Sequence, residues 1–400
     1  MLLKKLMTQA RDFFEDTVKV ERVKWIQLTA ECKGNTYITA PDEDSLCQYD
    51  CLPRCGTAKI PRPIFKRLPA SNWESVLLCS DDALIRTLKH TDFALFVAVT
   101  DEACLNATLA YASHCSVDSK TKRKDPIFII PGVLEKFTRT DWETRRGAIN
   151  HDVYMIVTPK VREEARKFFN CPTLEGAEIE NQGGAGTRGA HWEKRVLENE
   201  AMTGVTTQVY AISRITFALF EDSGWYQMDY DKADNMTWGK GLGCDFAKKS
   251  CLTWMKSKSG PFPFCTKEGD MTCSANRKAK VICNFVEGMP MPDIYDYNEP
   301  NLYTDRKGKP THGGGTELTA DYCPYYRVFG ELSVEASDTR CTYPGNMHYN
   351  NYSLEIFSRT ARCFALSGKI KIRKKLKTIT YIQHAGCYEV TLQKFYSSVT

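Results

Sequence analysis

Histidine is the residue type in this chain that could hold a catalytic metal, and its spacing can be read directly. A catalytic zinc needs three protein ligands and one open position, where the bound water acquires a pKa of about 7. The H-E-x-x-H motif supplies two ligands from one helix face and a glutamate as general base. No two histidines here are four residues apart, and none is followed by glutamate, so the 400 residues lack the motif. The seven histidines are His90, His114, His151, His191, His312, His348 and His384.

The segment from Gly189 to Gly204 still has the features of half a metal site. His191 follows a glycine-rich stretch, residues 181–190, which predicts a loop that could carry the imidazole back across a cleft. Met202 precedes Gly204, which would permit a tight turn beneath a metal. Alone, His191 would be interpreted as a surface histidine and Met202 as a core residue. The glycines do not predict a phosphate-binding loop, because no G-K-[ST] follows them.

Several ordered blocks resemble the leishmanolysin-type metallopeptidases, and within them the animal leishmanolysin-like peptidases. The main block runs from Trp192-Glu193-Lys194-Arg195 to Glu200-Ala201-Met202-Thr203-Gly204. The resemblance covers most of residues 1–365. Further blocks are Leu109–Ala112, Val157–Val161, Cys171–Gly176, Asn181–Gly184, Glu221–Tyr226, Trp238–Cys244 and Ala320–Pro324.

The resemblance implies a metzincin core in which three histidines bind one zinc ion above a methionine turn. Carried over by motif, His191 is the third zinc ligand and Met202 the turn methionine. The general-base glutamate belongs to the absent motif, so no catalytic residue and no site for another cofactor is assigned. His114 or His151, with Glu193 or Glu198, are the residues that could substitute for the missing ligands.

The missing motif marks a gap within the chain. In the family, the zinc helix lies between the strand that ends near Pro131 and the segment around His151. Here Pro131-Gly132-Val133 runs straight on, so a discrete block is absent. The complete form is expected to be a zinc metalloendopeptidase with protein or peptide substrates, and this chain is expected to be inactive. The alternative is a non-catalytic isoform or paralogue that acts in binding or cell adhesion.

Composition indicates a disulfide-bonded globular protein. The chain is 42% hydrophobic and 26% charged, and its net charge of +5 favours a solvated surface over nucleic-acid binding. Seventeen cysteines spread along the chain favour disulfides and a secretory, extracellular or membrane-associated location. A zinc site on Cys47, Cys51 and Cys55 is the rival interpretation. No signal peptide or transmembrane run is found, so a cytoplasmic location is the alternative.

The expected fold class is α+β, with an incomplete metzincin-like protease core between cysteine-rich, loop-heavy flanking domains. Residues 1–115 are assigned to the N-terminal cysteine-rich region and the start of the protease domain, and 116–205 to the remnant of the zinc-protease core with the third histidine and the methionine turn. Residues 206–400 are assigned to a C-terminal cysteine-rich domain that is expected to be cut short relative to the family. Periodicity predicts helices at 3–26, 159–169 and 213–219, and strands at 93–100, 107–112, 126–131 and 153–157.

One run is strongly basic. Residues 369–377 contain six lysines or arginines and alternate with isoleucine at first. The favoured interpretation is a solvated edge strand, and contact with an anionic surface is the alternative.

Overall fold

The fold was analysed in a computed structural model. It describes residues 2–20, seven short strands between residues 25 and 89, residues 133–328 except 185, 206, 208 and 258, and residues 338–346, 354–366, 370–374, 377–381 and 384–390. Helices and strands are both well represented, which confirms the α+β class. The expected strands at 93–100, 107–112 and 126–131 lie outside the described residues, and so do His90, His114 and His348.

The chain divides into two compact units. One contains residues 1–17, 131–224 and 228–400, and the other contains residues 18–130 and 225–227. The second unit includes the strands β2 (Trp25–Gln27), β3 (Cys32–Ile38), β4 (Leu46–Tyr49), β5 (Arg54–Cys55), β6 (Ala58–Lys59), β7 (Leu78–Cys79) and β8 (Thr87–Lys89). The domain boundaries expected at 115/116 and 205/206 stay predictions.

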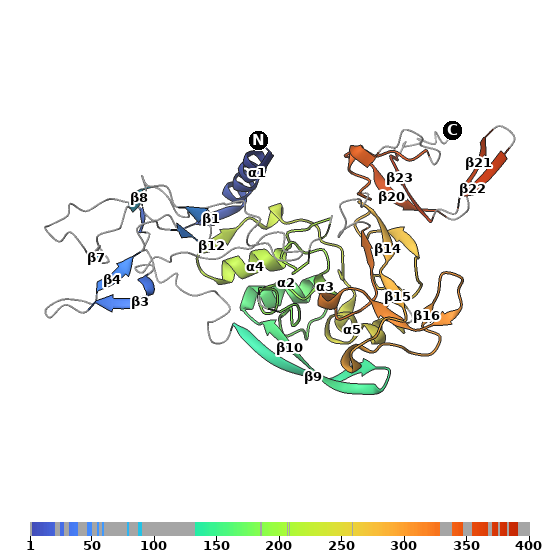
Figure 1. The fold of residues 1–400 in the computed structure, drawn as a ribbon, viewed down its shortest axis with the longest axis horizontal. Helices are drawn as coiled ribbons and strands as arrows, with labels where there is room; N and C mark the ends of the chain where they lie inside the picture. The colour runs from blue at the N-terminus through green and yellow to red at the C-terminus, as the bar shows by residue number, and fades with distance from the viewer. Residues whose placement is uncertain are drawn as a thin grey trace, which may run out of the picture. The chain divides into compact units, whose positions relative to one another are not determined.

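A long antiparallel hairpin forms the base of the first unit (Figure 1). Its strands are β9 (Leu134–Thr144) and β10 (Gly147–Ile156), and β10 also pairs with β11 (Ala177–Ile179). Inward-facing side chains such as Trp142, Val153 and Met155 are almost fully buried. The strand expected at 153–157 is therefore the end of β10. Strand β11 of the same sheet lies next to the segment that contains His191.

Two helices follow the sequence pattern closely and pack together. Helix α2 (Pro159–Phe169) begins at the expected proline, which suits the first helical turn, and buries Val161, Ala165 and Phe169. Helix α4 (Arg214–Asp222) begins after Ser213, whose side chain accepts a hydrogen bond from the Thr216 N–H. The short helices are α3 (Lys194–Leu197), α5 (Gly243–Lys248) and α6 (Cys251–Met255), and the 3-10 turns are η3 (Tyr230–Lys232), η4 (Asp293–Tyr295), η5 (Leu318–Ala320) and η6 (Pro344–Asn346).

The helix expected at 3–26 is wrong in its second half. Helix α1 spans Leu2–Thr17, and the chain then forms β1 (Val18–Val20), which pairs with β12 (Tyr226–Met228). A strand partner more than 200 residues away overrides the helical periodicity at this point.

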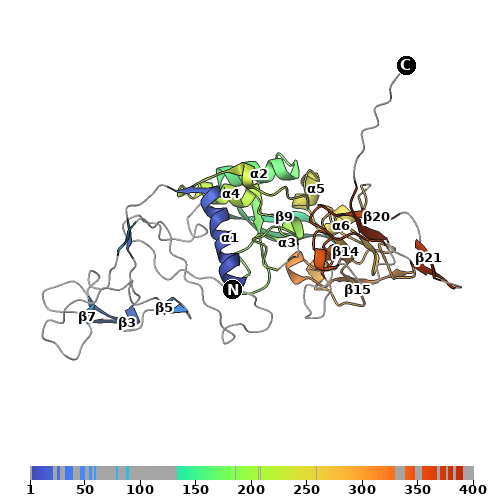
Figure 2. The ribbon, with the colours of Figure 1, turned by 90° about the horizontal axis from the view of Figure 1, so that it is seen from above.

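Disulfides hold the C-terminal half together. Its small sheets are β13 (Met271–Cys273), β14 (Lys280–Cys283) and β19 (Tyr326–Val328); β15 (Phe285–Glu287) and β18 (Gly313–Gly315); β16 (Tyr303–Thr304) and β17 (Pro310–Thr311); β20 (Arg362–Ala365) and β23 (Ala385–Tyr388); and β21 (Ile370–Lys374) and β22 (Lys377–Tyr381). Strands β20 and β14 lie close together in both views (Figures 1 and 2), and β23, the partner of β20, contacts β14. The disulfides are Cys171–Cys244, Cys251–Cys323, Cys265–Cys283, Cys273–Cys363 and Cys341–Cys387. No helix within the described ranges has the length and apolar character needed to cross a bilayer.

Candidate functional site

The structure brings His191 and the Met202 turn side by side through the backbone. The Trp192 N–H donates to the Met202 carbonyl at 3.0 Å, and Trp192 bridges to Thr203. On the other side, the Glu180 N–H donates to the His191 carbonyl at 2.9 Å, and Trp192 bridges to Ile179 of β11. The segment that carries His191 is therefore bridged on one side to β11 and on the other side to the methionine turn.

The loop before His191 is a series of turns, as its glycines predict. Within it, Nδ1 of His191 lies 3.2 Å from the Thr187 carbonyl oxygen. Gly204 is required for a different reason from the one expected, because its φ is not positive. A Cβ added at Gly204 would lie 2.4 Å from Cγ2 of Thr187 and 3.7 Å from Cγ of His191. The absence of a side chain lets the methionine turn pack directly against this loop.

A buried carboxylate, Glu200, fixes the methionine turn. It accepts hydrogen bonds from the Met202 N–H at 2.5 Å and from the Ser213 N–H at 3.1 Å. The hydroxyls of Ser213 and Thr216 donate to the same carboxylate, and the Trp192 indole donates to Thr216. Burial raises the pKa of Glu200, and these hydrogen bonds act in the opposite direction. One side chain thus connects Met202, the N-terminus of α4 and the residue after His191.

The Met202 side chain itself does not pack in a core. It is 46% exposed, although its backbone is firmly held. The assignment of Met202 as the turn methionine stays a prediction, and no part of the described chain covers its side chain.

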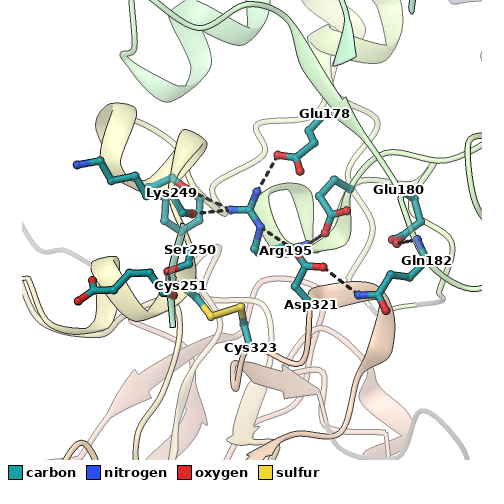
Figure 3. Close-up of polar contacts among 12 residues, drawn as sticks. Glu178, Glu180, Gln182, Arg195, Lys249, Ser250, Cys251, Asp321 and Cys323 are labelled. Atoms are coloured by element: carbon teal, nitrogen blue, oxygen red, sulfur yellow. Dashed lines mark hydrogen bonds and ion pairs between the residues drawn. A yellow bond between two sulfur atoms is a disulfide. The ribbon is translucent and has the colours of Figure 1, made fainter. Parts of the chain in front are cut away.

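A second buried cluster connects the His191 loop to the C-terminal half (Figure 3). Arg195 of α3 is 1% exposed and forms ion pairs with Glu178 at 2.7 Å and Asp321 at 3.1 Å. Its guanidinium also donates to the Lys249 carbonyl at 3.2 Å. Asp321 accepts a further hydrogen bond at 2.9 Å from Gln182, which lies in the loop before His191.

Carboxyl groups outnumber cations in this Arg195 cluster. Burial raises the pKa of Glu178, although Arg195 opposes the shift. Burial also raises the pKa of Glu180 to about 8 and that of Glu193 well above its ordinary value. One oxygen of each of these three carboxyls has no hydrogen-bond partner among the described residues. Burial therefore favours the protonated form at Glu180 and Glu193, since an unpaired buried charge is costly, whereas Glu178 is paired with Arg195.

Three of the four residues that could have substituted for the missing zinc ligands lie in the described chain, and each has another role. His151, in β10, is buried and stacks on Trp142 with ring centroids 4.0 Å apart. Glu193 caps α3 by accepting a hydrogen bond from the Arg195 N–H, and Glu198 lies 3.6 Å from the Lys194 ammonium. Across the described ranges, no three His, Cys, Asp or Glu side chains are grouped so that they could hold a metal. The described residues around His191 therefore do not make a zinc site.

Sequence reasoning missed Glu200, Gln182 and Asp321 as structural residues of the site. Their only signal was their position within the blocks that resemble the family. The buried run Glu193-Lys194-Arg195 was an equally unexpected feature, because consecutive charged residues normally indicate a surface.

The comparisons with known proteins agree on one family. A family model described as leishmanolysin matches residues 135–399. The chain is 41% identical to a leishmanolysin-like peptidase of Caenorhabditis elegans, over 96% of this chain and 71% of that protein. It is 40% identical to a leishmanolysin-like peptidase of Drosophila melanogaster, over 64% of this chain and 40% of that protein. It is 31% identical to leishmanolysin of Leishmania major, over 54% of this chain and 33% of that protein.

Proposed function

Because the chain belongs to the leishmanolysin family of peptidases, we propose that its complete form is a zinc metalloendopeptidase and that these 400 residues lack hydrolytic activity. The observation that carries the proposal is the missing H-E-x-x-H motif in a chain that keeps the other half of the site. His191 and Met202 lie on neighbouring segments joined by a backbone hydrogen bond, and Glu200 accepts a hydrogen bond from the Met202 N–H. These contacts support the view that the remaining half of the motif still folds.

The comparisons support a missing block. The alignment with the C. elegans protein extends over 479 residues, more than the 400 residues of this chain. That relative therefore contains residues within the aligned region that have no counterpart here. The family match begins at Glu135, just after the Pro131-Gly132-Val133 junction where the motif is expected.

The charged residues near His191 support inactivity. Glu193 and Glu198 already cap α3 or pair with Lys194, and His151 is stacked inside the core. A single imidazole cannot replace a three-ligand site that must also leave one position open. Zinc would supply the Lewis acid and the activated water in the complete form, and this chain supplies one histidine toward it.

The five disulfides support an extracellular or secretory location, because such bonds persist in oxidising compartments. They also favour a second candidate function. A C-terminal half cross-linked in this way can stay folded without the zinc helix, and it could bind a protein partner, for instance in cell adhesion.

The test uses the purified 400-residue chain. We expect no stoichiometric zinc by elemental analysis and no cleavage of a peptide library. The variant His191→Ala should match the wild type, as should the control His312→Ala, which changes an exposed histidine. Chelator-sensitive cleavage that is lost in His191→Ala and kept in His312→Ala would refute the proposal. Sequencing the gene between the codons for Pro131 and Val133 tests whether an exon for the motif exists.

A further inference from the structure

Positive charge is concentrated in one stretch near the C-terminus. Residues 356–388 contain eight lysines and arginines and no aspartate or glutamate. The net charge of the whole chain is +5, so the remaining residues carry a net charge of −3. A local excess of this size within an otherwise acidic chain indicates an anionic partner.

The fold arranges this stretch as a ribbon on a disulfide-fastened base. Strands β20 and β23 are antiparallel, with Cys363 opposite Cys387, and both cysteines are disulfide-bonded to other segments. The Leu366 N–H donates to the His384 carbonyl at 2.8 Å, which extends the pairing beyond the strand ends. The chain therefore leaves and returns at one anchored point, and β21 and β22 lie between these two ends (Figure 1).

The strand register assigns the residues of β21 and β22 to two faces of the ribbon. Lys371 is opposite Thr380, and Arg373 is opposite Thr378. Because directly opposed residues share a face and alternate residues lie on the same side, these four positions form one face, here named the basic face. The other face holds Ile370, Ile372, Ile379 and Tyr381, with Lys374 and Lys377 opposed at its end. No third strand joins β21 and β22 among the described strands.

We propose that this ribbon binds a sulfated polysaccharide through its basic face. Sulfate groups present oxygen acceptors and a fixed negative charge, which suit the planar donors of Arg373, the ammonium of Lys371 and the threonine hydroxyls. Segments of five to eight residues that are rich in lysine and arginine are a known signal for nuclear localisation or for heparin or nucleic-acid contact.

The compartment decides between these partners. Five disulfides between Cys171 and Cys387 are typical of an extracellular or lumenal setting. Nucleic acid is not the expected partner there, and anionic lipids are concentrated on the cytoplasmic leaflet of membranes. Sulfated polysaccharide is the polyanion that an oxidised extracellular protein meets. This inference does not depend on whether the chain cleaves peptides.

The experiment measures binding of the full chain to immobilised heparin by surface plasmon resonance at several salt concentrations. The variant Lys371→Gln/Arg373→Gln should bind roughly five- to tenfold more weakly at low salt, since each exposed ion pair contributes modestly. Its affinity should also fall less steeply with salt, because fewer counterions are released. The matched control is Lys307→Gln/Lys309→Gln, which removes two exposed charges from the loop before β17 and should bind as the wild type does.

A charge-retaining variant separates lost charge from lost folding. Lys371→Arg/Arg373→Lys keeps both cations and should keep most of the affinity. Loss of binding in that variant, or equal weakening in the Lys307/Lys309 control, would overturn the proposal. So would binding to double-stranded DNA, or to vesicles of phosphatidylserine and phosphatidylcholine, that is as tight as binding to heparin.

Discussion

Arg195→Met removes the cation that two buried carboxylates share. Arg195, Glu178 and Asp321 are 1%, 3% and 0% exposed at the side chain, and the ion pairs measure 2.7 and 3.1 Å. Breaking a buried pair by deleting one partner costs about 3–5 kcal/mol, because the remaining charge is uncompensated. Methionine carries no charge and replaces the aliphatic stem of arginine, so the change removes the guanidinium and its hydrogen bonds but keeps much of the apolar packing.

The destabilisation caused by Arg195→Met has an upper limit that depends on pH. An orphaned carboxyl can bind a proton, and neutralising a group with an ordinary pKa of 4.5 at pH 7 costs about 3.4 kcal/mol. At pH 5 the same step costs about 0.7 kcal/mol. Burial already raises the pKa of Glu178 and Arg195 opposes that shift, so in the variant the folded-state pKa of Glu178 lies above the unfolded value; its stability is present at low pH and is lost as the pH rises.

The assay is chemical denaturation with the disulfides intact, followed by tryptophan fluorescence at pH 5 and pH 7. We expect a loss of about 3–5 kcal/mol at pH 7 and a clearly smaller loss at pH 5. The control Arg188→Met changes an exposed arginine and should alter the free energy of unfolding by less than about 0.5 kcal/mol. A loss in Arg195→Met below about 1 kcal/mol, or a loss that is equal at both pH values, would refute the reasoning.

Three further changes test other parts of the site. Glu200→Gln should destabilise the fold by about 1–3 kcal/mol, because its amide cannot accept all four hydrogen bonds; the same denaturation assay measures it. Gly176→Ala should destabilise it more strongly, since the added Cβ would lie 2.0 Å from the Ile156 carbonyl oxygen, whereas the Cβ of Gly184→Ala meets nothing within 4 Å and brings only the backbone strain of a φ of 74°. For Glu175, burial raises the pKa, but hydrogen bonds from Arg139 and Lys248 outweigh it and lower the pKa to about 2. Its stabilising contribution should be present above pH 4.5 and lost as the pH falls toward 2, and Glu175→Gln should flatten that part of a stability–pH curve.

Local patterns predicted the helices and the buried strand because their causes are local. Pro159 starts α2, and the apolar stripe of that helix faces the core. The end of α1 at Thr17 could not be predicted, because a strand pairing with residues 226–228 decides it.

The candidate site, too, was predictable from the sequence only in part. The proximity of His191 and Met202 followed from a contiguous motif. The ion pair between Arg195 and Asp321 joins residues 126 positions apart, and no rule of sequence spacing predicts such a pair. The burial of Lys194 and Arg195 depends on acceptors that only the folded chain assembles.

The disulfide pattern also has a consequence for the thiols of the chain. All ten cysteines from Cys171 onward are used in five bonds. The other seven all precede Pro131, and they are Cys32, Cys47, Cys51, Cys55, Cys79, Cys104 and Cys115. Seven sulfurs cannot pair completely among themselves, so at least one thiol before Pro131 has no partner within the chain. A block absent after Pro131 would be the natural source of its partner, and mass spectrometry of the alkylated, unreduced chain would identify that cysteine.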